Sequence, residues 1–181
     1  PLLPEIESIQ PEDCAVVELS SFQLHSINIR PDVAVITNVS PNHLDKHPTY
    51  EDYIESKKRI FLNQTGDDLL VLNRDNGITA RFAEEAGSRV VQFSHRETVK
   101  NGVFCRDGML YYSHDYAVEA IIPETEILLP GEHNVENYMA AFAAVDGLVP
   151  DRCVRAVARR FQGVEHRIAY RMGWISEEKM R

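Results

Sequence analysis

The fold of this chain is decided by residues 31–61, which read PDVAVITNVSPNHLDKHPTYEDYIESKKRIF. Residues 33–36 form a short apolar run rich in β-branched side chains, which predicts a buried strand. Residues 50–62 then place aromatic and apolar side chains three and four positions apart, which predicts a helix. Ligands of open α/β sheets bind outside the carboxyl ends of the strands. The polar loop between these two elements is therefore a candidate site.

Short apolar runs of the same kind recur at residues 14–19, 67–73 and 89–93. Residues 78–85 have a helical pattern and precede Gly87, a candidate helix end. Buried strands joined by crossovers imply a parallel sheet. We therefore expect an α/β fold with a mostly parallel, doubly wound sheet flanked by helices.

The pattern changes over residues 102–129. Asp107-Gly108 lies between two apolar runs, which is a hairpin signal. Further short strands are expected at residues 118–122 and 126–129, so this region predicts a small antiparallel sheet appended to the parallel one. Two helices are expected after it, one ending at Gly147 and a last, amphipathic one around residues 153–161.

Composition excludes several classes of protein. The 181 residues are enough for one domain, and the hydrophobic and charged fractions, 44% and 26%, are ordinary. A net charge of −9 without a basic tract argues against nucleic-acid binding. No apolar run approaches the roughly 20 residues that span a bilayer. The three cysteines are far apart and show no metal-binding spacing, which indicates reduced thiols in the cytoplasm.

Polar residues follow the run at residues 14–19 directly. An acid at the end of a buried strand, as Glu18 would be, can hold a nucleotide-bound Mg²⁺, or it can simply mark the point where the strand reaches water. The side chains of Ser20 and Gln23 can hydrogen-bond a polar ligand. They can equally cap a short helix, since Ser is a preferred N-cap residue.

The loop after residues 33–36 contains His43, Asp45 and His47. Imidazole and carboxylate ligands suit Mg²⁺ or Mn²⁺, although a lone histidine is more often a hydrogen-bonded structural residue. Lys57 shares a helix face with Tyr53, four positions before it. A protonated lysine is repelled by a metal ion, so Lys57 fits such a site only as a neutral amine or as a carbamate formed with CO₂.

Two later segments are candidates for binding phosphate or nucleotide. Residues 131–134 (GEHN) precede a predicted helix and can present backbone N–H groups and amides to a nucleotide, or they can form a turn with Asn134 as the N-cap. Arg167 can place its guanidinium on a phosphate, or lie in a surface loop. Neither G-x-x-x-x-G-K-[ST] nor G-x-G-x-x-G occurs in the chain.

Taken together, the motifs resemble those of the Mur ligases. Within that family the match is to the branch that adds D-glutamate to UDP-N-acetylmuramoyl-L-alanine in peptidoglycan synthesis, and ELSSFQL is its most specific part. The matching stretches occur in the family's order: VVELSSFQL (16–24), ITNVSPNHLDKH (36–47), YIESKKRIF (53–61), VLNRDN (71–76), LPGEHNVENYMAA (129–141) and FQGVEHR (161–167).

The resemblance implies a Rossmann-like sheet of the P-loop NTPase type and an ATP-dependent, ADP-forming ligase. ATP phosphorylates the alanyl carboxylate, and the amine of D-glutamate attacks the resulting acyl phosphate. The resemblance implies that Glu18 binds the Mg²⁺ of ATP, and that His43 binds a second Mg²⁺, which a carbamylated Lys57 supports. It implies that Ser20 and Gln23 lie near the muramoyl substrate. On the nucleotide side, it implies that Asn134 and Asn137 lie beside the nucleotide and that Arg167 contacts the γ-phosphate.

The resemblance also sets expectations for domain organisation. Residues 1–167 correspond to most of the central ATP-binding domain without its P-loop, and residues 168–181 match nothing, with Ala169 where the family has an acid. The UDP-binding N-terminal domain and the C-terminal domain are not in the sequence. We expect these residues alone to have no ligase activity and to form a dimer through exposed sheet surface, whereas the full-length enzyme would be a monomer.

Three other functions stay open at this point. A sister Mur ligase would add another amino acid with the same chemistry. A metal-dependent hydrolase would need His43, Asp45 and His47 to converge on one ion. A catalytically inactive binding domain would bind a nucleotide or a UDP-sugar without depending on Lys57.

Overall fold

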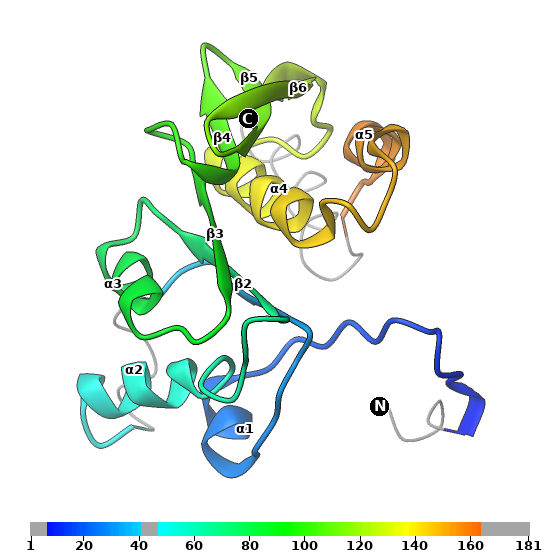
Figure 1. Cartoon of the computed structure of the whole chain (residues 1–181). Coiled ribbons are helices and arrows are strands. Elements are labelled where there is room, and N and C mark those ends of the chain that lie inside the picture. The colour runs from blue at the N-terminus through cyan, green and yellow to red at the C-terminus, as the bar shows by residue number, and fades with distance from the viewer. Residues whose placement is uncertain (1–6, 41–46, 164–181) are drawn as a thin grey trace, which may run out of the picture.

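Six strands form one sheet in the computed structural model, which describes residues 7–40 and 47–163 (Figure 1). The strands lie side by side in chain order, from β1 to β6. The pairs from β1 to β4 are parallel, and β4, β5 and β6 pair antiparallel. The strands are β1 (Val33–Ile36), β2 (Leu69–Asn73), β3 (Arg89–Ser94), β4 (Asn101–Arg106), β5 (Met109–His114) and β6 (Ala117–Pro123).

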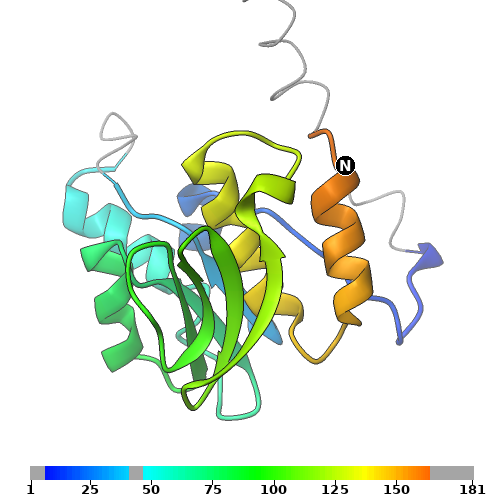
Figure 2. The same ribbon diagram turned by 90° about the horizontal axis from the view of Figure 1, so that it is seen from above.

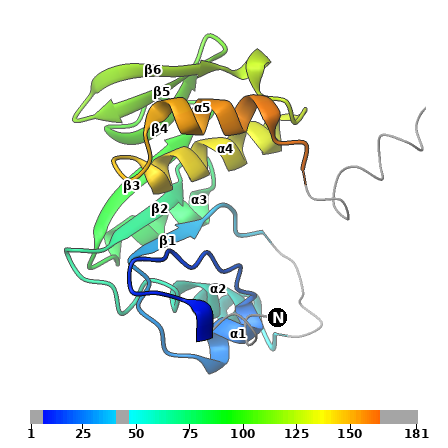
Figure 3. The same cartoon turned by 90° about the vertical axis from the view of Figure 1, so that its right-hand side faces the viewer.

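Helices cover both faces of the sheet, as the view from above shows (Figure 2). One face carries α2 (Tyr50–Lys58) and α3 (Gly77–Arg81), and α1 (Ser21–Ser26) packs against α2. The other face carries α4 (Glu132–Val145) and α5 (Asp151–Arg160), which lie across the strands in Figure 3. Among the described residues, no helix is both long enough and apolar enough to cross a membrane.

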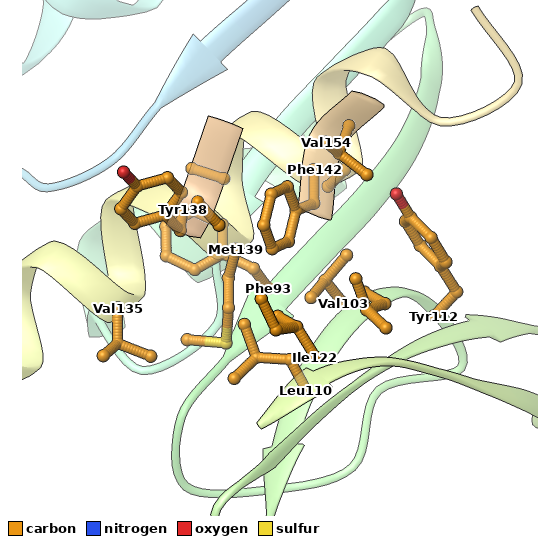
Figure 4. Close-up of a cluster of buried hydrophobic side chains, with 14 of the residues drawn as sticks. Phe93, Val103, Leu110, Tyr112, Ile122, Val135, Tyr138, Met139, Phe142 and Val154 are labelled. Carbon is orange, nitrogen blue, oxygen red and sulfur yellow. The ribbon is translucent and has the colours of Figure 1, made fainter. Parts of the chain in front are cut away.

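The core has two layers because β2 is buried on both of its faces. Leu70 and Leu72 point into a cluster with Phe61 and Phe82 beneath α2 and α3. The alternate residues of β2, Leu69 and Val71, point into a larger cluster against α4 and α5. Figure 4 shows this larger cluster, whose members come from the strands (Phe93, Val103, Leu110, Tyr112, Ile122) and from the helices (Val135, Tyr138, Met139, Phe142, Val154). Burial on two faces explains the continuous apolar runs of the sequence.

The antiparallel strands predicted after residue 102 are present, and they are joined to the parallel strands in one continuous sheet. β4 pairs parallel with β3 on one side and antiparallel with β5 on the other. Gly102 permits the close approach to β3, because a Cβ there would lie 1.9 Å from the Gln92 carbonyl oxygen. The predicted hairpin turn is confirmed: Asp107 and Gly108 both have positive φ angles, of 52° and 72°, as a type I′ turn requires.

Two predicted strands are absent from the described residues. Residues 14–19 are irregular, and Val16 is 91% exposed. Their apolar pattern is that of a strand, but a strand also needs a paired neighbour, and β1 pairs only with β2 in the described part of the chain. Residues 126–129 form the end of a 3₁₀ turn, η3 (Glu124–Glu126), and a loop from which Ile127 and Leu129 bury in the core.

The expected helices are present with changed boundaries. The helix predicted over residues 50–62 ends earlier, at Lys58. The helix predicted over residues 78–85 is the short α3 followed by a 3₁₀ turn, η2 (Phe82–Glu84), so Gly87 does not cap it. The last two helices are confirmed as α4 and α5.

We predict that Phe93→Ala lowers the free energy of unfolding by about 3–5 kcal/mol, because it leaves a cavity in the middle of the larger cluster. Phe93 is fully buried. Phe161, at the end of α5, is 43% exposed and is the matched control, with an expected loss of about 1 kcal/mol or less for Phe161→Ala. Urea denaturation measures both, and equal losses would contradict the core assignment.

Candidate functional site

Polar side chains connect the loops at the carboxyl edge of the parallel strands. The Asn73 amide, at the end of β2, donates to the Thr37 carbonyl after β1, at 2.9 Å. The Asp75 carboxylate accepts from the Ser94 hydroxyl at 2.6 Å and from the His95 backbone N–H at 2.7 Å, after β3. The loops after three adjacent strands are thus joined into one polar edge, as expected for a ligand site of an open α/β sheet.

The N-terminus of α4 lies at this edge, because His95 Nδ1 is 3.5 Å from the carboxylate of Glu132. The helix begins at Glu132 after Gly131, whose φ of 105° favours glycine. Asn134 is therefore inside the first turn and is not the N-cap. Its side chain is buried and donates to the Pro130 carbonyl at 2.7 Å, whereas Asn137, three residues on, is exposed.

Glu18 and Lys57 are brought within electrostatic range of each other. Lys57 lies in the last turn of α2, half-buried, with its Nζ 5.8 Å from the centre of the Tyr53 ring. Burial lowers the pKa of Lys57 below its usual range, and the Glu18 carboxylate opposes this by attracting the ammonium form. The burial effect is the larger one, so at a given pH a larger fraction of Lys57 is in the neutral amine form than for a surface lysine.

The pKa of Lys58, the next residue, is shifted in the opposite direction. Its ammonium group bonds to Glu55 and Glu85, each at 2.8 Å. These two carboxylates outweigh desolvation and raise the pKa of Lys58. The two adjacent lysines of α2 therefore differ in how strongly they hold their proton, and Lys57 is the one whose neutral amine is favoured.

Ser20 and Gln23 form a capping box at the start of α1. The Gln23 side-chain oxygen accepts from the Ser20 backbone N–H at 2.8 Å and from its hydroxyl at 2.9 Å. The Ser20 hydroxyl in turn accepts from the Gln23 backbone N–H at 3.3 Å. Of the two interpretations that the sequence left open, the structure supports the helix cap.

His47 is buried, and both of its ring nitrogens contact protein side chains. Its Nε2 is 2.8 Å from the Ser21 hydroxyl, and its Nδ1 is 2.7 Å from the carboxylate of Asp52. The rings of Phe22 and Tyr53 pack against it. These contacts give His47 a structural role in holding α1 against α2.

Three predicted site residues, His43, Asp45 and Arg167, lie outside the described residues. The structure also shows a cluster that the sequence did not indicate, made of His95, Cys105 and Glu124. The Cys105 thiol lies 3.7 Å from a Glu124 oxygen, and burial together with this carboxylate raises the pKa of the thiol to about 11. These residues are ten and 19 positions apart on different elements, so no local pattern could have found them.

The fold and the polar edge define the class of protein to which this chain belongs. A family model described as the Mur ligase middle domain matches residues 6–145. The chain belongs to this family.

The relatives give a closer view. The UDP-N-acetylmuramoylalanine--D-glutamate ligase of Acetivibrio thermocellus is 49% identical over 168 residues, and the ligase of the same name from Ruminiclostridium cellulolyticum is 46% identical over 168 residues. Each match covers 93% of this chain and 36% of the relative. The chain thus spans about a third of the length of the curated relatives it matches.

Solved structures confirm the α/β fold with a Rossmann-like middle domain. MurF from Acinetobacter baumannii superposes with a TM-score of 0.58 and 19% identity, over 80% of this chain and 32% of that one. The MPL ligase from Neisseria meningitides gives a TM-score of 0.56 and 18% identity, over 74% of this chain and 41% of that one. At this level of identity the likeness concerns the fold alone.

We predict that the pKa of Lys57 lies below that of a free lysine and falls further in Glu18→Gln, because the change removes the attraction that favours the ammonium form. NMR titration of the lysine side-chain carbons measures it, with assignment from Lys57→Arg. Lys58 is the internal control, and its pKa should lie above that of a free lysine. An unchanged Lys57 pKa in Glu18→Gln would show that the two groups are not coupled.

Proposed function

We propose that this chain supplies the middle-domain residues of an ATP-dependent, ADP-forming ligase that joins D-glutamate to UDP-N-acetylmuramoyl-L-alanine through an acyl phosphate. The names of the relatives at 42–49% identity support the substrate pair. The observation that carries the proposal is the half-buried Lys57 amine within electrostatic range of the Glu18 carboxylate.

Lys57 has a role in this chemistry once it is modified. Its neutral amine forms an N–C bond to CO₂ and releases one proton to solvent, which leaves an anionic carbamate. The positive charge that would repel a metal ion becomes a pair of oxygen ligands. Burial favours this step, because it stabilises the uncharged amine that attacks CO₂.

With Lys57 in the carbamate form, the donor set suits Mg²⁺. The Glu18 carboxylate and a carbamate are hard oxygen donors, the type that Mg²⁺ prefers, whereas an ammonium group at Lys57 would not fit. When bound, Mg²⁺ supplies positive charge against the phosphates and the substrate carboxylate. We assign the Mg²⁺ of ATP to Glu18 and a second Mg²⁺ to His43 with Lys57; Mn²⁺ would suit the same donors.

The start of α4 is suited to the nucleotide. The N-terminus of a helix carries partial positive charge and outward N–H groups. Asn137 is exposed one turn into α4, so its amide is available to a base or a ribose, while Asn134 holds the turn through Pro130. Arg167 would add a planar guanidinium for the γ-phosphate.

Ser20 and Gln23 keep a more limited role near the muramoyl substrate. Their oxygens are engaged in the capping box of α1, so a direct contact with substrate would come from the amide N–H groups of Gln23. The cap also fixes the start of α1, two residues after Glu18. We therefore regard the pair as positioning residues for Glu18 as much as ligands of the substrate.

A sister ligase that adds another amino acid is the second candidate. The D-glutamate ligases share 42–49% identity with the chain, while the solved sister ligases share 18–19%, which favours the first proposal. We place the enzyme in the cytoplasm, in line with three free cysteines. We also propose that the full-length ligase is a monomer, and that residues 1–181 on their own dimerise.

The proposal can be tested with a chimaera in which residues 6–163 replace the aligned segment of the Acetivibrio thermocellus ligase. We expect ADP release that depends on both UDP-N-acetylmuramoyl-L-alanine and D-glutamate. Lys57→Arg in the chimaera keeps the positive charge but cannot form the carbamate, so kcat should fall roughly 100-fold or more.

Lys58→Arg is the matched control, and its kcat should stay close to that of the parent chimaera because its ion pairs persist. The same segment placed in a sister ligase should be inactive. A folded chimaera without turnover, or one that is indifferent to Lys57→Arg, would contradict the proposed function.

A further inference from the structure

Three different metal-binding side chains meet where β3, β4 and η3 come together. His95 follows β3, Cys105 lies in β4, and Glu124 begins η3. Their ligand atoms all lie within 4.8 Å of one another, and each residue is partly buried. This cluster is not composed of carboxylates alone, because it offers one nitrogen, one sulfur and one oxygen.

The spacing of the ligand atoms fits a tetrahedral ion. His95 Nε2 lies 3.2 Å from Glu124 Oε2, and Cys105 Sγ lies 3.7 Å from the same oxygen. Zn²⁺ bound at its usual Zn–N, Zn–O and Zn–S lengths separates tetrahedral ligand atoms by roughly 3.3 to 3.7 Å. The side chains would therefore need only small movements to bind such an ion.

The second nitrogen of the same imidazole provides an independent observation. His95 Nδ1 faces the carboxylate of Glu132 at 3.5 Å, while Nε2 faces Cys105 and Glu124. Metal-binding histidines almost always donate their other ring N–H to a carboxylate, a carbonyl or water, which fixes the tautomer and the ring orientation. The His95 backbone N–H donates to Asp75 at 2.7 Å, so the main chain that carries the ring is held as well.

We propose that His95, Cys105 and Glu124 bind one thiophilic divalent transition-metal ion, of which Zn²⁺ is the type, with water as a fourth ligand and Glu132 as the residue that orients His95. The Cys105 thiol binds as the thiolate, and its proton is released to solvent. Mixed nitrogen and sulfur donors select against Mg²⁺, which prefers oxygen ligands. The site is thus chemically distinct from the one proposed around Glu18 and Lys57.

The ion would add a cross-link between elements that already pack together in the larger cluster. It would link the end of β3 to β4 and to η3, and through Glu132 it would fix the first turn of α4. This site does not depend on the proposed ligase activity, since none of its residues takes part in that chemistry.

Titration of the tag-free, chelator-treated chain with Co²⁺ and then Zn²⁺ tests the proposal. We expect one equivalent of Co²⁺ to give the intense visible bands of a tetrahedral ion and a sulfur-to-cobalt charge-transfer band. Zn²⁺ should displace the Co²⁺ and raise Tm, and Mg²⁺ should do neither. Cys105→Ser should abolish the charge-transfer band, and Glu132→Gln should weaken Zn²⁺ binding roughly 10- to 100-fold.

Cys153→Ser is the matched control, because Cys153 is exposed on α5, and it should leave every signal unchanged. Circular dichroism establishes that each variant folds, and Glu124→Gln provides a second variant should Cys105→Ser not fold. Absence of stoichiometric Co²⁺ binding, or a charge-transfer band that persists in Cys105→Ser, would overturn the proposal and leave a hydrogen-bonded cluster only.

Discussion

Desolvation of a single amine, that of Lys57, is the constraint on which the functional account depends. Burial disfavours the ammonium form of this side chain, and one carboxylate, Glu18, partly offsets the cost. The adjacent Lys58 is also desolvated, but two carboxylates, Glu55 and Glu85, outweigh that cost. Burying a lysine whose charge is only partly offset lowers the stability of the fold. Perturbed pKa values of this kind cluster at functional sites, which is why we propose a chemical role for Lys57.

The sheet explains how residues far apart in the sequence come to lie at one edge of the molecule. Parallel strands β1 to β4 end at one edge, and hydrogen bonds from Asn73 and Asp75 hold the loops of that edge together. Helices on both faces bury the apolar runs, and α4 brings its N-terminus to the same edge through Glu132. Rigid layers thus position polar groups that the loops alone could not hold.

The sequence predicted those features that depend on the local pattern of residues. Residues 33–36, the helix after Thr49 and the Asp107-Gly108 turn are confirmed, because periodicity, an N-cap and a φ preference are local properties. The strand at residues 14–19 was wrong because an apolar run does not specify its pairing partner. Of the two interpretations of residues 131–134, the one with Asn134 as the N-cap placed the start of α4 three residues too late, since Gly131 takes the N-cap position. The partners of His47 lie 26 residues before it and five after it, and only the tertiary structure brings them together.

The most direct measurement of the central claim is ¹³C NMR of the chain in ¹³C-bicarbonate at mildly alkaline pH. The account predicts a carbamate resonance, separate from that of the N-terminal amine, which is lost in Lys57→Arg, retained in Lys58→Arg and strengthened as the bicarbonate concentration rises. A folded chain that shows no such resonance at saturating bicarbonate, or one whose resonance survives Lys57→Arg, would contradict the assignment of Lys57 as the reactive amine.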